Sequence, residues 1–152
     1  MFFAVDPAEL TGEAAFQRDI AQRLGIRCLR YGVDEPGWGG YNGIVDALLG
    51  TGSSGAPRGP YAELIAQANK SGMPIVAIDI PSGLDADTGQ VYDPCMRAVV
   101  TVALAFKKRG LVQFPGAGCA GEVVVRSIGI PARAADEHEV GVFELSENVL
   151  AA

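Results

Sequence analysis

The chain has 152 residues, of which 49% are hydrophobic and 20% charged, and its formal net charge at pH 7 is −6. This length is enough for one domain with a substantial core, and the acidic balance argues against a general binder of nucleic acids or acidic membranes. No apolar run approaches the roughly 20 residues of a membrane span, and the opening MFFAVDP lacks the features of a signal peptide. Three widely spaced cysteines without a CxxC pair (Cys28, Cys95 and Cys119) indicate reduced thiols in a cytoplasmic protein.

The first part of the chain predicts two short strands with a helix between them. Residues 2–5 are apolar and favour a strand. Thr11 is a suitable N-cap for a helix whose apolar residues Phe16, Ile20 and Leu24 recur at helical spacing, and Gly25 would end it. Residues 26–29 favour a second strand, and the acidic, glycine-rich stretch 32–42 favours a loop.

The remainder predicts further strands at 44–49, 75–80, 99–106 and 123–128, with a helix over 61–69 that has Pro60 in its first turn. Strands that are apolar throughout and separated by helices or long crossovers are typical of a parallel sheet covered on both faces. We therefore expect an α/β, Rossmann-like, three-layer αβα fold in a single domain over residues 1–152. The polar stretch 132–152 is expected to be a peripheral tail with one weak strand at 142–145.

Polar residues collect where three of these strands end. Asp46 lies inside the strand at 44–49, and the loop GTGSSGAP follows that strand. Asp79 lies near the end of the strand at 75–80, with Ser82 after it, and three cations (Lys107, Lys108 and Arg109) follow the strand at 99–106. Since ligands of open parallel sheets bind at the carboxyl ends of the strands, these groups are expected to surround one cleft. The single histidine, His138, lies in a polar stretch, which argues against Ser-His-Asp or Cys-His chemistry.

Each of these groups also has a structural interpretation. GTGSSG satisfies GxGxxG after a strand, which fits either anion binding by exposed amides or an ordinary turn. Asp46 is either a cation ligand or an edge residue facing water. Asp79 is either a desolvated acid–base group or the cap of the turn that follows it. The three cations are either phosphate contacts or a solvated strand end, and the acidic LDADTG stretch does not have calcium-loop spacing, so we expect a solvated turn there.

Four motifs occur in an order that resembles the NAD(P)H-hydrate epimerase family, the YjeF N-terminal domain. They are VDALLGTGSSG, DIPSGLDADTG, FKKRGLVQFPG and GEVVVRSIGIP, and the D-x-P-S-G-x-x-x-D-x-G pattern from Asp79 to Gly89 is the most specific. The resemblance extends over residues 2–131. It implies a Rossmann-like fold, a bound potassium ion, and interconversion of the R and S forms of hydrated NADH and NADPH.

The resemblance also implies roles for individual residues. Asp46 and Ser82 would be potassium ligands, and Asp79 would contact the hydrated nicotinamide ring. The remaining substrate contacts would come from Gly50, Thr51, Gly52, Ser53, Ser54, Gly55, Ala56 and Lys108. Epimerisation requires a hydroxyl to leave and water to return on the other face, so one carboxyl group, for which we select Asp79, could protonate the departing oxygen and deprotonate the incoming water.

The sequence departs from the family pattern at its start. It opens at the family's second strand, without the first strand and the Gly/Asn-rich loop that supplies phosphate contacts and a potassium ligand. In the strand order 3-2-1-4-5-6 the first strand is central, so two apolar edges would be left unpaired. Three explanations of the missing strand are open. The chain is truncated and has low activity, another chain supplies the missing part, or the sheet closes around the gap.

The expected partners follow from the same reading. They are a hydrated nicotinamide cofactor and a separate ADP- or ATP-dependent dehydratase, with the oligomeric state left open, a homodimer included. Two rival functions remain. One is a non-catalytic nucleotide-binding or scaffold protein of the same fold, and the other is an NAD(P)-dependent oxidoreductase that uses GTGSSG as a dinucleotide fingerprint.

Overall fold

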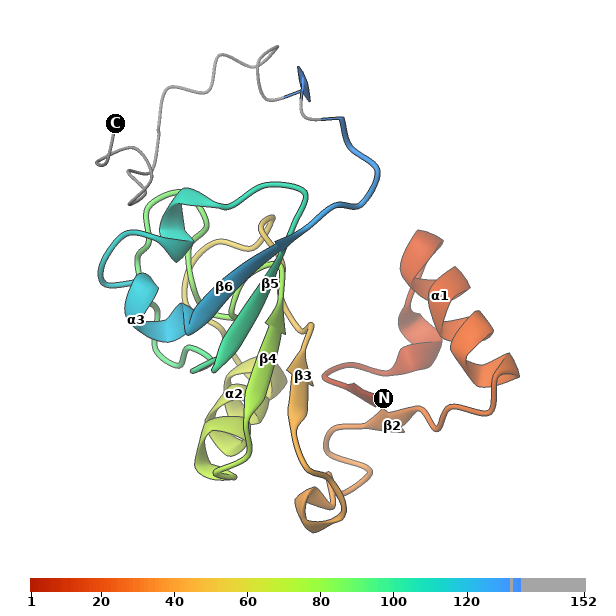
Figure 1. Cartoon of the computed structure of the whole chain (residues 1–152). Helices are drawn as coiled ribbons and strands as arrows, with labels where there is room; N and C mark the ends of the chain where they lie inside the picture. Colours follow the sequence, from red (N-terminus) through yellow and green to blue (C-terminus); the bar gives the residue numbers. More distant parts are fainter. Residues whose placement is uncertain (132, 135–152) are drawn as a thin grey trace, which may run out of the picture.

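The computed structural model of the chain describes residues 1–131, 133 and 134 (Figure 1). The predicted strand at 142–145, His138 and most of the predicted tail over 132–152 therefore lie outside the described residues. No helix in the described part is long and apolar enough to cross a membrane.

A four-stranded parallel sheet forms the centre of the molecule. Its strands are β3 (Ile44–Asp46), β4 (Ile75–Ile78), β5 (Val100–Leu104) and β6 (Glu122–Arg126), and they lie side by side in that order. This arrangement confirms the predicted α/β class and the parallel sheet. All four strands are shorter than predicted. β4 and β5 end where the backbone takes a left-handed conformation, at Asp79 with φ 69° and at Ala105 with φ 60°.

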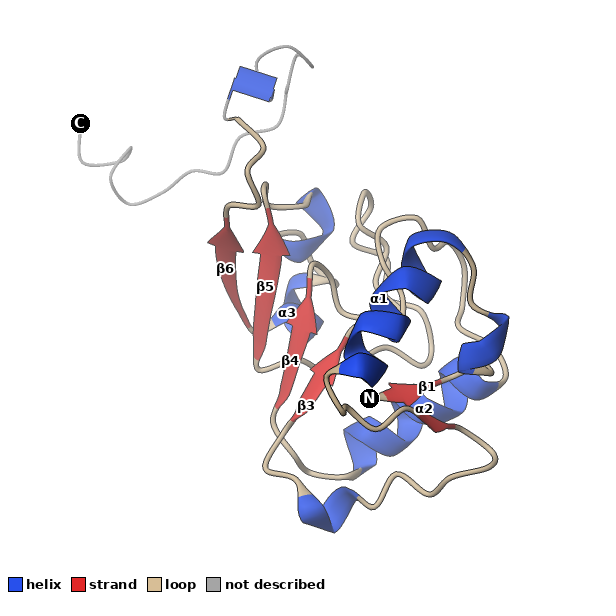
Figure 2. Ribbon diagram, turned by 90° about the vertical axis from the view of Figure 1, so that its right-hand side faces the viewer, coloured by secondary structure: helices blue, strands red, loops and turns tan. Residues whose placement is uncertain are grey.

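Helices lie on both sides of β3. α2 (Pro60–Lys70) begins with proline at its first turn, as predicted, and buries Leu64, Ile65 and Ala68. α1 (Gly12–Arg23) lies on the opposite side, so that Figure 2 shows α1 in front of the strands, with α2 and the short α3 (Ala117–Ala120) behind them. The described part also contains three 3₁₀ turns, η1 (Pro7–Glu9), η2 (Trp38–Gly40) and η3 (Arg109–Leu111).

The core lies between the sheet and the segment that connects β4 to β6. One buried cluster joins Ile80, Leu84, Ala86, Cys95, Ala103, Leu111 and Ala120, and a second joins α2 to β4 through Ile65, Ala68, Ile75 and Met96. The fully buried members of both clusters come from residue 65 onward, and Trp38, Ile44 and Leu48 of the earlier part pack against the second cluster only as partly buried side chains. The well-packed part of the domain is therefore the part that carries the DIPSGLDADTG and FKKRGLVQFPG motifs.

The N-terminal unit, residues 1–34, forms a second, two-stranded parallel sheet. β1 (Phe2–Phe3) pairs only with β2 (Leu29–Arg30), and both run across the direction of β3 (Figures 1 and 2). Within the described residues β3 has β4 as its only strand partner, which confirms the predicted unpaired edge, and Val45 on this edge is 67% exposed. Closure of the sheet around the gap, one of the three expectations, does not occur.

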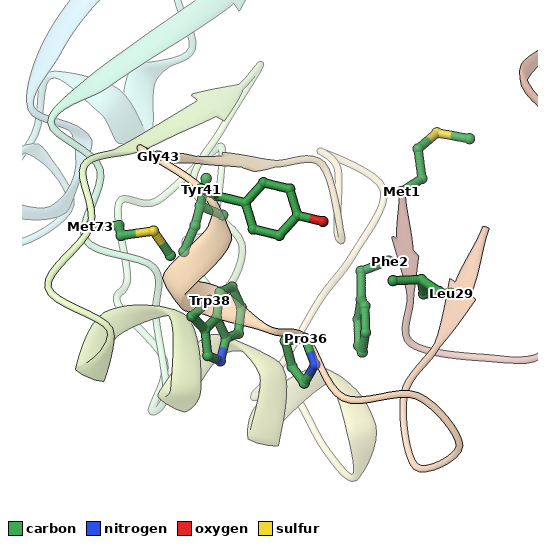
Figure 3. A pocket seen from close by; sticks show the side chains of 9 residues that line it. Met1, Phe2, Leu29, Pro36, Trp38, Tyr41, Gly43 and Met73 are labelled. Carbon is green, nitrogen blue, oxygen red and sulfur yellow. The ribbon is translucent and has the colours of Figure 1, made fainter. Parts of the chain in front are cut away.

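Two hollows separate the N-terminal unit from β3. The larger, of about 610 Å³, lies between β1, α1 and the residues around Val45, Ala47 and Leu48. The smaller, of about 190 Å³, lies at the amino end of β3, where Figure 3 shows Met1, Phe2 and Leu29 across from a second group formed by Trp38, Tyr41 and Met73. The unit thus contacts the main sheet through a loosely packed boundary, and the only buried side chain of α1 is Ala21.

We expect amide hydrogens of residues 1–34 to exchange with solvent faster than those of β4 and β5, because segments with few buried apolar contacts open locally at low free energy. Hydrogen–deuterium exchange followed by mass spectrometry at neutral pH measures this difference. Equal protection of β1 and β5 would contradict the loose attachment of the N-terminal unit.

Candidate functional site

A buried carboxylate ties the ends of β3 and β4 together. Asp46 is 1% exposed. Its Oδ2 accepts a hydrogen bond from the Ser82 backbone N–H at 2.7 Å, and its Oδ1 accepts one from the Ser82 hydroxyl at 2.6 Å. Leu48 N–H also donates to Oδ1, at 3.3 Å, in a local turn that ends the strand. Asp46 therefore does not face water at the sheet edge.

Asp46 is costly to keep charged in this position. Burial raises the pKa of its carboxyl group, and the hydrogen bonds from Ser82 and Leu48 oppose that effect only in part. No ion pair to Asp46 is found among the described residues. A buried carboxylate with donors but without a counter-charge is a place where a bound cation would lower the free energy.

The oxygen atoms around Asp46 are of the kinds that could hold a potassium ion. Besides the carboxylate they are the Ser82 hydroxyl and the Leu49 carbonyl oxygen, which lies 3.5 Å from that hydroxyl. Hard cations are bound by oxygen ligands of these kinds. Within the described residues no group of three His, Cys, Asp or Glu side chains gathers to hold a metal, so a cation here would rely on neutral oxygens for most of its ligands.

The glycine-rich loop lies directly beside Ser82. The Ser82 hydroxyl accepts a hydrogen bond from Leu49 N–H at 3.0 Å, and Ser53 N–H donates to the Gly50 carbonyl at 3.0 Å to form a turn. All residues from Gly50 to Ala56 are exposed. The hollow between this loop and the Pro81–Leu84 turn measures about 10 Å³, which is about the space of one water molecule.

Asp79 lies at the end of β4 in an ion pair with Lys108. Its Oδ1 accepts hydrogen bonds from Leu104 N–H, at 3.0 Å, and from the Lys108 ammonium group. Lys108 also donates to the Leu104 carbonyl at 2.8 Å. Both side chains are 21% exposed, so a ligand at the carboxyl ends of the strands could reach them. Asp79 thus does not cap the turn that follows it, and Lys108 is not a solvated strand end.

The two motif segments on either side of this pair pack backbone to backbone. A Cβ atom on Gly110 would lie 2.2 Å from the Asp85 carbonyl oxygen, and one on Gly83, where φ is +94°, would lie 2.5 Å from the Pro94 carbonyl oxygen. Only glycine permits such approaches. Gly110 therefore allows the segment that carries Lys108 to pack directly on the turn that follows Asp79, and Gly83 allows that turn to pack on Pro94 and Cys95.

The acidic LDADTG stretch is a turn in which only Asp87 and Thr88 are exposed, whereas Leu84, Ala86 and Gly89 are buried, so the predicted solvated turn is correct only for its tip. Asp85 Oδ1 accepts hydrogen bonds from Thr88 N–H, the Thr88 hydroxyl and Asp87 N–H at 2.8–3.1 Å. These bonds, led by those from Thr88, lower the pKa of the Asp85 carboxyl group. The oxygens of this turn are used internally, and Arg109 Nε donates to the Asp87 carbonyl.

The structure therefore brings the predicted residues to one edge of the sheet. Asp46 and Ser82 are in direct contact, the Gly50–Ala56 loop adjoins them, and the pair of Asp79 and Lys108 lies at the adjacent strand ends. Sequence reasoning missed the parts played by Leu49 and Leu104, which act through backbone atoms. Residue type carries no signal for such contacts.

A family profile described as YjeF-related protein N-terminus matches residues 1–110, well over half of the chain. The chain belongs to this family. The motifs at Asp46, Gly50–Ala56, Asp79 and Lys108 of this YjeF-related protein all lie within the matched residues.

Curated relatives carry two kinds of name. This YjeF-related chain is 40% identical over 125 residues to an NAD(P)H-hydrate epimerase of Rhodopirellula baltica, covering 81% of the chain and 51% of that protein. It is 35% identical over 130 residues to one of Weissella koreensis, covering 86% of the chain and 58% of that protein. A bifunctional NAD(P)H-hydrate repair enzyme of Moorella thermoacetica is 49% identical over 88 residues, which cover 58% of the chain and 17% of that enzyme. The chain thus spans only part of each relative.

A solved structure supports the fold. A crystal structure of the yeast protein YNL200c superposes on the YjeF-related chain with a TM-score of 0.66 and 23% sequence identity, over 90% of this chain and 58% of the yeast chain. The Rossmann-like arrangement inferred from the sequence is thereby confirmed.

Replacement of Ser82 by alanine should destabilise the protein by about 1–3 kcal/mol at neutral pH, because the buried carboxylate of Asp46 loses a donor. Loss of the Ser82 hydroxyl raises the pKa of Asp46 further, and a raised pKa in the folded state favours the protonated form. The penalty should therefore be small in acid and grow as the pH rises through the folded-state pKa. Thermal unfolding at several pH values measures it.

Ser54→Ala is the matched control, since this serine is exposed in the same loop region. Its melting temperature should stay close to that of the unmodified chain. A Ser82→Ala penalty that is the same at acid and neutral pH would contradict the assignment to the Asp46 carboxylate.

Proposed function

We propose that this chain acts as an NAD(P)H-hydrate epimerase that interconverts the R and S forms of hydrated NADH and NADPH. The observation that carries the proposal is the Asp79 carboxylate, held at the end of β4 by Leu104 and Lys108 and accessible from the edge that also holds Asp46, Ser82 and the glycine-rich loop. The names of the epimerase relatives support the same substrate and reaction.

The chemistry required is modest and suits these groups. The hydrated ring carries a hydroxyl on a carbon next to the ring nitrogen, and loss of that hydroxyl gives a planar cation. Water then returns to either face. A carboxylate fixed beside the ring stabilises the cation electrostatically, and protons must be exchanged with the departing and returning oxygen. We assign Asp79 as the carboxylate that lies beside the reacting carbon of the ring.

The glycine-rich loop is the proposed contact for the rest of the substrate. Residues Gly50 to Ala56 are exposed and combine glycines with Thr51, Ser53 and Ser54, so that backbone N–H groups and hydroxyls can donate to phosphate oxygens. Lys108 adds a positive charge at the same edge. In this arrangement the loop binds the cofactor and Asp79 acts on its ring.

A potassium ion is the proposed cofactor, held by Asp46 and Ser82. When bound, it supplies a positive charge that compensates the buried carboxylate of Asp46. The hydroxyl of Ser82 would then remain linked to Leu49 N–H, at the first residue before the glycine-rich loop. The role of Asp46 and Ser82 is to hold this loop in place rather than to take part in the reaction.

The partners and location follow from the same function. Other relatives are named bifunctional NAD(P)H-hydrate repair enzymes, and we propose that a dehydratase acts on the same hydrated cofactors as this chain. A cytoplasmic location is supported by the free cysteines Cys28, Cys95 and Cys119. A homodimer would cover the open edge of β3.

One observation favours the non-catalytic alternative. The hollow between the glycine-rich loop and the Pro81–Leu84 turn measures only about 10 Å³, so the loop must move before this hollow can take up any part of a nucleotide. A scaffold protein of the same fold has no such requirement. The two functions differ in whether hydrated cofactor is bound and turned over.

The purified chain should epimerise pure R or S NADPHX towards the equilibrium mixture, as followed by chromatography of the two forms. Asp79→Asn should lower the rate by about 100-fold or more, because the neutral amide no longer stabilises the cation electrostatically, and loss of one such group costs about 10²–10³. Asp87→Asn, which changes an exposed carboxylate of the neighbouring turn, is the matched control and should retain the rate. No turnover by the unmodified chain, together with no binding heat in calorimetry, would favour the scaffold alternative.

Potassium chloride should raise the melting temperature more than choline chloride does at equal ionic strength. At a potassium concentration of 100 times its Kd, the free energy of unfolding should rise by about 2.7 kcal/mol. The effect should weaken in acid, because the proton competes for the raised-pKa carboxylate of Asp46. Asp46→Asn should abolish the difference between the salts, whereas Asp87→Asn should leave it. Identical melting curves in the two salts would refute potassium binding at this site.

A further inference from the structure

The ion pair at the end of β4 has an asymmetric hydrogen-bond arrangement. Both donors to Asp79, from Leu104 N–H and Lys108, reach the same oxygen, Oδ1. No described residue donates to Oδ2. Lys108 uses two of its three N–H groups, one on Asp79 and one on the Leu104 carbonyl. One carboxylate oxygen and one ammonium N–H group therefore remain for a ligand.

The backbone around the pair is strained in a way that holds this arrangement. Asp79 and Ala105 both adopt left-handed conformations, with φ 69° and 60°, and they are the only non-glycine residues with positive φ in the described part of the chain. Asp79 N–H donates to the Val102 carbonyl, and Ala105 N–H donates to the Arg126 carbonyl, each at 2.8 Å. Strain that is retained at adjacent strand ends points to a functional geometry.

The proton needed by the proposed reaction is held by only one member of this pair. In a carboxylate–ammonium ion pair Asp79 is ionised and carries no proton to give, whereas Lys108 carries three. Arg109, the next cation along the chain, is turned towards the Asp87 carbonyl. The sequence suggested that Asp79 protonates the departing hydroxyl, and the ion pair with Lys108 argues against that role for Asp79.

We infer that Lys108 is the catalytic acid of the epimerisation, and that Asp79 remains ionised and stabilises the cation. The inference rests on the proposed function. In the first step the Lys108 N–H proton passes to the ring hydroxyl, the C–O bond breaks with its electron pair leaving on water, and the ring-nitrogen lone pair forms the C=N bond of the cation. In the second step water adds to the other face, the C=N pair returns to nitrogen, and neutral Lys108 regains the proton. No group is oxidised or reduced.

Substitution by arginine separates proton donation from positioning. Arginine keeps the positive charge and the hydrogen-bond donors that can hold Asp79, but its guanidinium does not give up a proton in proteins. Methionine removes both properties while keeping an unbranched side chain. If Lys108 is the acid, Lys108→Arg and Lys108→Met should both lower kcat by about 100-fold or more. A residue that only positions Asp79 would be rescued by arginine.

The experiment compares kcat for NADPHX epimerisation in the unmodified chain, Lys108→Arg, Lys108→Met and Lys70→Met. Lys70, an exposed lysine in the last turn of α2, is the matched control. Calorimetry with NADPHX and thermal unfolding accompany each variant, so that a loss of rate in a folded variant that still binds substrate is attributed to the chemical step.

Each outcome decides between the two proposals. Folded, substrate-binding Lys108→Arg and Lys108→Met variants with the expected loss support the inference. Near-normal turnover by Lys108→Arg would assign Lys108 only a positioning role and would overturn the inference. Near-normal turnover by Lys108→Met would also overturn the inference. Either result would leave the proposed function intact. Absence of turnover by the unmodified chain removes the proposed function and the inference together.

Discussion

The hydrogen bonds between Asp46 and Ser82 are the contact on which the rest of the site depends. They join residues that are 36 positions apart in the chain and fix the turn after β4 against the end of β3. Through the Ser82 hydroxyl the same contact reaches Leu49 and sets where the glycine-rich loop begins. The carboxylate is desolvated to make this contact, and this burial raises its pKa.

The part of the site around Asp79 and Lys108 is positioned by close packing of the backbone. Gly110 and Gly83 allow the segments that carry Lys108 and Ser82 to approach neighbouring carbonyl oxygens without a Cβ in between. The left-handed residues Asp79 and Ala105 then turn the ends of β4 and β5 so that the ion pair forms at the rim. The strain is tolerated because the buried clusters around Ile80 and Leu111 hold these segments in place.

Much of this arrangement could be predicted from the sequence. Uniformly apolar strands predicted the parallel sheet, and the carboxyl-end rule predicted that Asp46, Ser82 and Asp79 would converge. Strand ends were placed too late, because left-handed backbone at Asp79 and Ala105 leaves no mark in an apolar pattern. The contact between Asp79 and Lys108 was missed, since sequence proximity says nothing about side chains 29 positions apart. The position of the N-terminal unit across β3 could not be predicted, because strand patterning indicates which residues form strands but not how two sheets meet.

The open edge of β3 has a consequence for how the protein behaves in concentrated solution. A bare strand edge with an outward valine is a template on which another chain can add backbone hydrogen bonds. Mutual repulsion from the net charge of −6 opposes such growth, and salt weakens that repulsion. High ionic strength should therefore favour association of two copies along the open edge of β3.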